Sequence, residues 1–211
     1  MMNPNPWRRF QELLDALAEE GTLQRTATVE ALEKFASSFT ENADRDMYRG
    51  ELGVSLARAG SLDVAVKLIG GMENPHEKAN YWRKLAEQQF KKDDRRRALS
   101  FLRDAEQAAD SLGPDCFWQR AEVLSMNAKL LDDFNLDGEA RSAWDGAISI
   151  ARTGQAADPN SSDCSAVLVN IVRTLAELGQ VELAQSAADS IAIPARRKFA
   201  QELIERASPQ K

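Results

Sequence analysis

The stretch LGVSLARAGSLDVAVKLIGGMENP, residues 52–75, contains the pattern from which the rest of the chain can be interpreted. A run with helical spacing ends at Gly60, a second run opens directly after it, and Pro75 ends the unit. Residues 171–194, IVRTLAELGQVELAQSAADSIAIP, repeat this arrangement, with glycine, alanine and proline each displaced by 119 residues. A helix that ends at glycine and is followed at once by another helix predicts an antiparallel hairpin. We therefore expect a chain built from helical hairpins.

Apolar residues recur at three- and four-residue spacing along the chain, which predicts about eleven helices. No segment alternates with a period of two over the length of a strand, so the predicted fold class is all-α. One segment without any period, TGQAADPNSSD, predicts a loop over residues 153–163. The expected helices span residues 7–20, 28–39, 43–59, 61–72, 76–90, 98–109, 117–131, 140–148, 167–178, 181–191 and 195–207.

Composition and charge restrict the class of protein. Hydrophobic residues make up 43% and charged residues 28% of the 211 residues, which is typical of a soluble globular protein. No apolar run approaches the ~20 residues that a transmembrane helix needs, and the N-terminus has no signal-peptide pattern. The two cysteines, Cys116 and Cys164, lie far apart, which favours reduced thiols in the cytoplasm. A net charge of −6 argues against nucleic-acid binding, so we expect a cytoplasmic protein with neither nucleic acid nor membrane as partner.

Alanines mark one equivalent position near the start of the second helix in each hairpin. Alanine suits this position because two helices approach closely only where their side chains are small. The successive spacings are 33, 42 and 44 residues, so the first is a clean repeat length and the other two imply insertions. The four aligned positions are Ala65, Ala98, Ala140 and Ala184.

The spacing and the signature residues resemble the tetratricopeptide repeat family, whose hairpins repeat every 33–34 residues. The resemblance covers residues 43–207 and implies hairpins stacked in a right-handed superhelix. In this interpretation residues 43–211 form the repeat array with a C-terminal capping helix, and residues 1–42 form a helical pair that is a degenerate repeat or a cap. The matching residues are Trp82, Leu85, Ala86, Ala98 and Ala105 in one copy, Leu52, Gly53, Gly60, Ala65 and Pro75 in another, Ala128, Ala140 and Ala147 in a third, and Gly179 and Ala184 in a fourth.

The resemblance also implies a function, because in that family the first helices of the hairpins line a concave groove that binds a peptide. The residues that the register places in such a groove carry more positive than negative charge, which suits an acidic or carboxylate ligand. The chain is therefore expected to be a non-catalytic scaffold or adaptor for a protein or peptide partner. The alternative is that these residues are ordinary exposed charges. The predicted groove residues are Arg83, Glu87, Lys129, Asn170 and Arg173.

The acidic segment DDFNLDG, residues 132–138, supports a competing hypothesis. Asp133, Asn135 and Asp137 match the opening half of a calcium loop, but Trp144 stands where that loop needs a glutamate. The paired aspartates at 132 and 133 are also typical of helical metal-dependent enzymes. We favour the interpretation of this segment as the turn of the third hairpin, with Asp137 capping the next helix. The alternatives are a metal-dependent enzyme centred on Asp132, Asp133 and Asp137, a calcium-binding protein, and a self-assembling structural protein.

Other candidate chemistry is sparse. His76 is the only histidine, so the sequence offers no transition-metal site and no catalytic triad. No glycine-rich phosphate loop is present, and we predict no cofactor, no metal and no catalytic residue. The basic run around Lys91 and Lys92 is interpreted as a solvated turn. The tryptophans fall at helical spacing and are expected to pack between helices.

Overall fold

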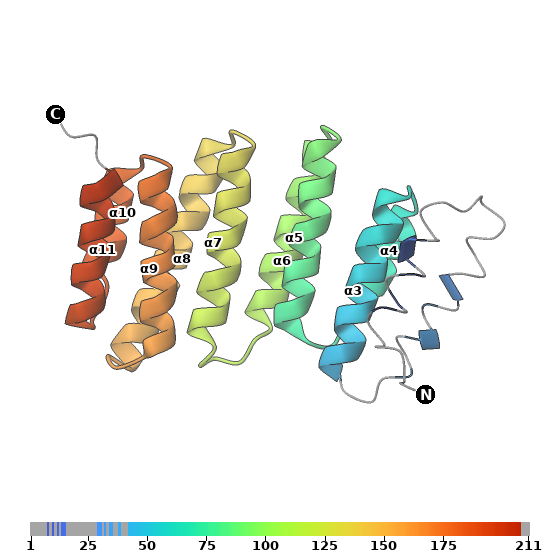
Figure 1. The fold of residues 1–211 in the computed structure, drawn as a ribbon, viewed down its shortest axis with the longest axis horizontal. Helices are drawn as coiled ribbons and strands as arrows, with labels where there is room; N and C mark the ends of the chain where they lie inside the picture. Colours follow the sequence, from blue (N-terminus) through green and yellow to red (C-terminus); the bar gives the residue numbers. More distant parts are fainter. Residues whose placement is uncertain are drawn as a thin grey trace. The chain divides into compact units, whose positions relative to one another are not determined.

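The structure is a computed structural model that describes residues 42–207 and scattered positions between residues 8 and 38. This described part contains nine α-helices and no strand, which confirms the all-α prediction for it (Figure 1). The two helices predicted over 7–20 and 28–39 lie largely outside the described residues. The helices are α3 (Asn42–Arg58), α4 (Leu62–Gly70), α5 (Pro75–Lys91), α6 (Arg95–Asp110), α7 (Phe117–Asp133), α8 (Asp137–Ala157), α9 (Ser162–Glu177), α10 (Val181–Asp189) and α11 (Pro194–Ala207).

The chain divides into two compact units, Met1–Ala108 and Ala109–Lys211, which we call the first unit and the second unit. In the first unit α3 packs against both α4 and α5. In the second unit α7 packs against α8, and α9 packs against α10 and α11 (Figure 1). Each unit therefore contains helices that follow one another in sequence and lie side by side as hairpins.

Each of the four hairpin turns within residues 42–207 passes through a residue with a left-handed backbone. The φ angles are 91° at Gly60, 59° at Asp93, 56° at Asn135 and 73° at Gly179. The residue after each of them donates its backbone N–H to a carbonyl five residues earlier, at 2.8–3.0 Å. These bonds define the Schellman motif, which satisfies the free carbonyls at a helix end. They join Ser61 to Leu56, Asp94 to Gln89, Leu136 to Leu131, and Gln180 to Leu175.

Five residues after each left-handed turn residue stands one of the predicted small residues. All four alanines are at most 1% exposed, so the prediction that they are buried is confirmed. At the α3–α4 contact, a Cβ atom added to Gly53 would lie 3.0 Å from Ile69 Cγ1 and 3.4 Å from the Ala65 carbonyl oxygen. The small residues therefore let the two helices of a hairpin approach closely. The four positions are Ala65, Ala98, Ala140 and Ala184.

Two buried polar side chains fix the loops that lead out of hairpins. In the first unit Asp46 is fully buried and its Oδ2 accepts from the backbone N–H groups of Glu73 and Asn74, at 2.8 and 2.6 Å. In the second unit Gln155 Oε1 accepts from the backbone N–H of Ala192 at 2.5 Å. Glu73 follows Gly60 at the same distance in sequence at which Ala192 follows Gly179. The backbone N–H groups of these two equivalent residues therefore donate to different side chains, Asp46 in the first unit and Gln155 in the second.

Aromatic side chains fill part of the core. In the first unit the ring of Tyr48 packs edge-on to Phe10 and Phe35, with ring centroids 4.6 and 5.5 Å apart. Trp82 of α5 stacks on Phe101 of α6 with centroids 5.5 Å apart. The prediction that tryptophans pack between helices is confirmed for Trp82 and for Trp144, which are 6% and 1% exposed.

The loop predicted over residues 153–163 is wrong for most of its length, because α8 continues to Ala157 and α9 begins at Ser162. Gly154 is one of the residues that made the segment resemble a loop, but Gly154 and its neighbour Gln155 are both buried inside α8. The amide nitrogen of Gln155 donates to Ser165 Oγ at 2.6 Å and to the Ser161 carbonyl at 3.2 Å. A buried, hydrogen-bonded glutamine is compatible with a helix, and its partner Ser165 lies beyond the segment, in α9.

A second correction concerns α11. The apolar spacing of residues 195–207 predicts that Phe199 shares a buried face with Ala200 and Ile204, but Phe199 is 41% exposed. The helix is anchored instead by Ala200 and Ile204, and by Arg197 Nε, which donates to the Ile191 carbonyl at 2.7 Å. The buried side of α11 is therefore narrower than the sequence pattern indicated.

The left-handed turns predict which substitutions lower the free energy of unfolding and which do not. Gly60→Ala and Gly179→Ala should each lower the free energy of unfolding by about 1 kcal/mol, because alanine is strained at positive φ. Neither glycine has other atoms near its missing Cβ, so the effect is one of backbone conformation. Asp93→Gly and Asn135→Gly should not destabilise. Urea unfolding followed by circular dichroism measures the stability of all four variants, and Gly113→Ala is the control. Equal losses of stability in Gly60→Ala and Gly113→Ala would contradict the left-handed backbone at Gly60.

The continuation of α8 predicts a steric effect at Gly154. An added Cβ would lie 2.6 Å from Cys164 Sγ and 2.7 Å from Phe117 Cβ, so Gly154→Ala should lower stability by ~1–3 kcal/mol through overpacking. The matched control is Gly138→Ala, also in α8, where the added methyl group meets open space. Thermal unfolding of the two variants is the measurement. A melting temperature unchanged in both would mean that Gly154 is not packed between α7 and α9.

Candidate functional site: a basic pocket between α3 and α5

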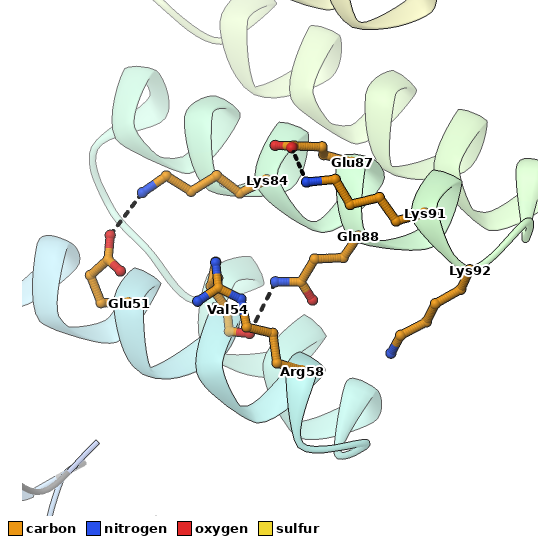
Figure 2. Close-up of a pocket in the computed structure, with 8 residues that line it drawn as sticks. All are labelled: Glu51, Val54, Arg58, Lys84, Glu87, Gln88, Lys91 and Lys92. Carbon is orange, nitrogen blue, oxygen red and sulfur yellow. Dashed lines mark hydrogen bonds and ion pairs between the residues drawn. The ribbon is translucent and has the colours of Figure 1, made fainter. Parts of the chain in front are cut away.

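A pocket of about 420 Å³ opens between α3 and α5 in the first unit (Figure 2). Pockets that bind small ligands have volumes of about 300–1,000 Å³, so this one has room for a compact group. Four of its lining residues are basic and two are acidic, which gives a local excess of two positive charges in a chain whose net charge is −6. The pocket is lined by Glu51, Val54, Arg58, Lys84, Glu87, Gln88, Lys91 and Lys92.

At one end of the pocket a closed network holds Glu51. Lys84 Nζ lies 2.7 Å from Glu51 Oε1 and 4.3 Å from the centre of the Tyr81 ring. The Tyr81 hydroxyl lies 3.1 Å from Glu51 Oε1 and 3.2 Å from the Met47 carbonyl oxygen. A Cβ atom added to Gly50 would lie 2.2 Å from the Tyr81 ring, so the glycine lets that ring pack on α3. The charges of Lys84 and Glu51 offset each other.

The middle of the pocket contains one hydrogen bond that joins the two helices and one exposed ion pair within α5. Gln88 Nε2 donates to the Val54 carbonyl at 3.2 Å and joins α5 to α3. Lys91 Nζ lies 2.5 Å from Glu87 Oε1, one helical turn earlier, but the Lys91 side chain is 64% exposed. An exposed pair of this kind contributes only ~0–1 kcal/mol, so Lys91 can exchange Glu87 for another anion at little cost.

At the other end the positive charge is not offset. Lys92 Nζ donates to the Ala57 carbonyl at 3.3 Å, a neutral partner. Arg58 has no hydrogen bond or ion pair with any residue that the structure describes. Figure 2 shows Arg58 reaching back along α3 toward Val54, and Lys92 pointing toward α3. Lys92 Nζ therefore lies near the C-terminal end of α3, where the helix dipole favours positive charge.

The pocket is formed by equivalent positions of consecutive hairpins. Glu51 on α3 and Lys84 on α5 are 33 residues apart, which equals the first repeat length. Arg58 and Lys91 have the same separation. This register is the signal by which the sequence could have located the pocket, since equivalent residues of adjacent hairpins face a shared space. The prediction missed Glu51, Arg58 and Lys84, and it interpreted Lys91 and Lys92 as a solvated turn.

The five predicted groove residues are distributed over both units. Glu87 lines the pocket, and Arg83 is half-buried on the same helix of the first unit. In the second unit Lys129 Nζ lies 2.8 Å from Asp133 Oδ2, so its charge is offset. Arg173 Nη1 donates to Asn170 Oδ1 at 3.1 Å, and both are exposed. That the five residues line one groove remains a prediction.

The acidic segment 132–138 forms the α7–α8 turn, as the favoured interpretation has it. Asp132 Oδ2 accepts from Trp144 Nε1 at 2.6 Å and Asp132 Oδ1 accepts from Gln180 Nε2 at 3.1 Å. The predicted capping role of Asp137 is wrong, because Leu136 is the N-cap of α8 and Asp137 is its first residue. Among the described residues no three histidine, cysteine or acidic side chains are grouped so that they could hold a metal ion.

Comparisons with known proteins do not assign the chain to a family. No family model, curated protein or solved structure matches it. None of the described helices is both long and apolar enough to cross a membrane. The feature of the described residues that bears on function is therefore the pocket between α3 and α5.

The network around Tyr81 predicts a pH dependence of stability. Burial first, and then the charges of Glu51 and Glu77, raise the pKa of the Tyr81 hydroxyl well above its ordinary value near 10. The unfolded tyrosine still ionises near pH 10, so the stabilising contribution of the neutral form is complete below that pH and is lost as the pH rises above it. Relative to Tyr81→Phe, the wild-type protein should lose up to ~1.4 kcal/mol of unfolding free energy per pH unit above about pH 10.

Urea unfolding between pH 9 and pH 11.5 measures this difference. The lysines and Tyr48, whose pKa is also raised by burial and by Asp44, are present in both proteins and cancel in the comparison. Parallel stability profiles for wild type and Tyr81→Phe would show that the Tyr81 hydroxyl is not buried against Glu51.

Proposed function

We propose that this protein is a non-catalytic scaffold or adaptor, similar in architecture to tetratricopeptide repeat proteins, and that it binds an acidic segment of a partner protein. The pocket between α3 and α5 is the proposed binding site in the first unit. The helical hairpins would stack as a right-handed superhelix in this interpretation. The two free cysteines, Cys116 and Cys164, support a cytoplasmic location.

The observation that carries the proposal is the uncompensated positive charge of the pocket. Arg58 and Lys92 have no acidic partner among the described residues, and they lie in a concave site between two helices. Charge-assisted hydrogen bonds from such groups to a carboxylate are about twice as strong as neutral ones. Gln88 adds a polar group that could orient a bound backbone.

The repeated turn supports the architectural part of the proposal. Four turns of the described residues each have a left-handed residue, the same pair of backbone hydrogen bonds, and a buried alanine five residues after the left-handed one. A chain that repeats one hairpin presents equivalent faces of successive first helices to a common side, which is how repeat proteins form extended binding surfaces. A metal-dependent enzyme or calcium-binding protein that uses the acidic segment 132–138 is less well supported. The carboxylates of Asp132 and Asp133 already have partners inside the protein, namely Trp144, Gln180 and Lys129.

The proposal predicts selective binding of acidic peptide. A fluorescein-labelled peptide of five glutamates should bind the full chain, and the matched peptide of five glutamines should not. Binding should weaken as salt rises from about 0.05 to 0.5 M, because screening shortens the range of exposed charges. The double variant Arg58→Glu with Lys92→Glu should weaken binding at least about tenfold. Fluorescence anisotropy is the measurement.

The matched control is Arg103→Glu with Lys67→Glu, which makes the same change of charge on α6 and α4, outside the pocket. Both control residues are exposed, so their substitution should leave the fold intact. Circular dichroism verifies that both double variants stay helical. An equal loss of affinity in the two double variants would show that net charge, and not the pocket, attracts the peptide.

A further inference from the structure

The pocket charges can be separated into those that are offset inside the protein and those that are not. Lys84 is paired with Glu51 at 2.7 Å, and Tyr81 further fixes that carboxylate. Lys91 is paired with Glu87 at 2.5 Å. The two charges that remain belong to Arg58, whose side chain reaches back along α3 toward Val54, and to Lys92, which points toward α3 (Figure 2). The ligand that completes this balance carries two negative charges.

The arrangement of these cations indicates how the two charges should be distributed. Lys92 Nζ lies near the C-terminal end of α3, and Lys91 belongs to the adjacent end of α5. A guanidinium group binds two oxygens of one phosphate in parallel, while lysine contributes a point charge. For a single compact dianion to contact both cations, the side chains of Arg58 and Lys92 must turn toward each other, and neither is held in place by an acidic partner among the described residues. Lys91 can then turn from Glu87 toward the same dianion.

We propose that the pocket recognises a phosphate monoester, a proposal that rests on the proposed function. The acidic segment of the partner presents this group as a phosphorylated side chain. A phosphate monoester carries a charge of about −1.5 to −2 at pH 7 and three acceptor oxygens. One carboxylate would leave one positive charge without a partner. Two carboxylates would reach the same total charge only as two side chains, and ordering both of them costs more conformational entropy than ordering one phosphorylated side chain.

The test uses three fluorescein-labelled pentapeptides that differ only at the central residue, which is phosphoserine, glutamate or serine. At pH 7.5 the phosphoserine peptide should bind the full chain about tenfold more tightly than the glutamate peptide. Arg58→Gln and Lys92→Gln should each remove most of this preference, while Arg103→Gln and Lys67→Gln should not change it. Unlabelled inorganic phosphate serves as competitor.

A pH comparison separates phosphate recognition from general attraction. The second ionisation of a phosphate monoester has a pKa near 6, so the preference for phosphoserine over glutamate should decline between pH 7.5 and pH 5.5. The titratable and charged groups that face the ligand are Arg58, Lys84, Lys91 and Lys92, together with Glu51 and Glu87, and none of the eight lining residues is a histidine. Lysine and arginine keep their charge over this range, and glutamates ordinarily ionise near pH 4.3.

The outcomes decide between specific alternatives. If inorganic phosphate displaces the peptide at concentrations near the dissociation constant of that peptide, the pocket takes the free phosphate group alone; if far more is needed, the peptide backbone adds to binding. Both outcomes support a phosphate site. Equal affinity for phosphoserine and glutamate peptides at pH 7.5 would overturn it and leave the proposed binding of acidic segments standing. Failure of all peptides, including the peptide of five glutamates, would overturn both.

Discussion

The backbone hydrogen bond that closes each hairpin turn is the interaction on which the rest of the structure depends. It can form only when the preceding residue adopts a left-handed backbone, and the chain supplies glycine, aspartate or asparagine at those four positions. These are the residues that tolerate positive φ with least strain. Once the turn is closed, its geometry fixes the direction of the second helix. The alanine five residues later is then directed into the contact, where a larger side chain would not fit.

The pocket follows from the same register. Residues of α3 and α5 that occupy equivalent places in consecutive hairpins face each other, so Glu51 meets Lys84 and Arg58 lies in the same pocket as Lys91. One pair of positions carries opposite charges and holds the helices together. The other pair carries like charges and leaves the site electropositive. A repeat thus produces both a structural ion pair and a candidate binding site from the same spacing.

The sequence predicts features that depend on nearby residues. The helices, the turn at Gly60 and the burial of Ala65 all follow from periodicity and turn chemistry within a few tens of residues. Gly154 and Gln155 were misinterpreted because their partners, Cys164, Phe117, Ser165 and Ala192, become neighbours only after folding.

Of the five residues that the sequence predicts for a groove, Glu87 lines the pocket, and the groove itself stays a prediction. The sequence did not single out Arg58, because a local pattern does not show whether a side chain has an acidic partner in the fold. Among the described residues Arg58 has no such partner. Lys129, in contrast, looked like a free cation in the sequence and is paired with Asp133 at 2.8 Å.

Native-state hydrogen exchange at the turn amides tests whether these backbone hydrogen bonds hold the hairpins closed. The backbone amides of Ser61, Asp94, Leu136 and Gln180 each follow a left-handed residue and donate to the preceding helix. An amide in a loop without such a bond exchanges at close to the rate of an unfolded chain, whereas a hydrogen-bonded one is protected in proportion to the free energy of opening. The account predicts that all four amides exchange at least roughly a hundredfold more slowly than in the unfolded chain. Unprotected exchange at these amides, while the flanking helices remain protected, would contradict it.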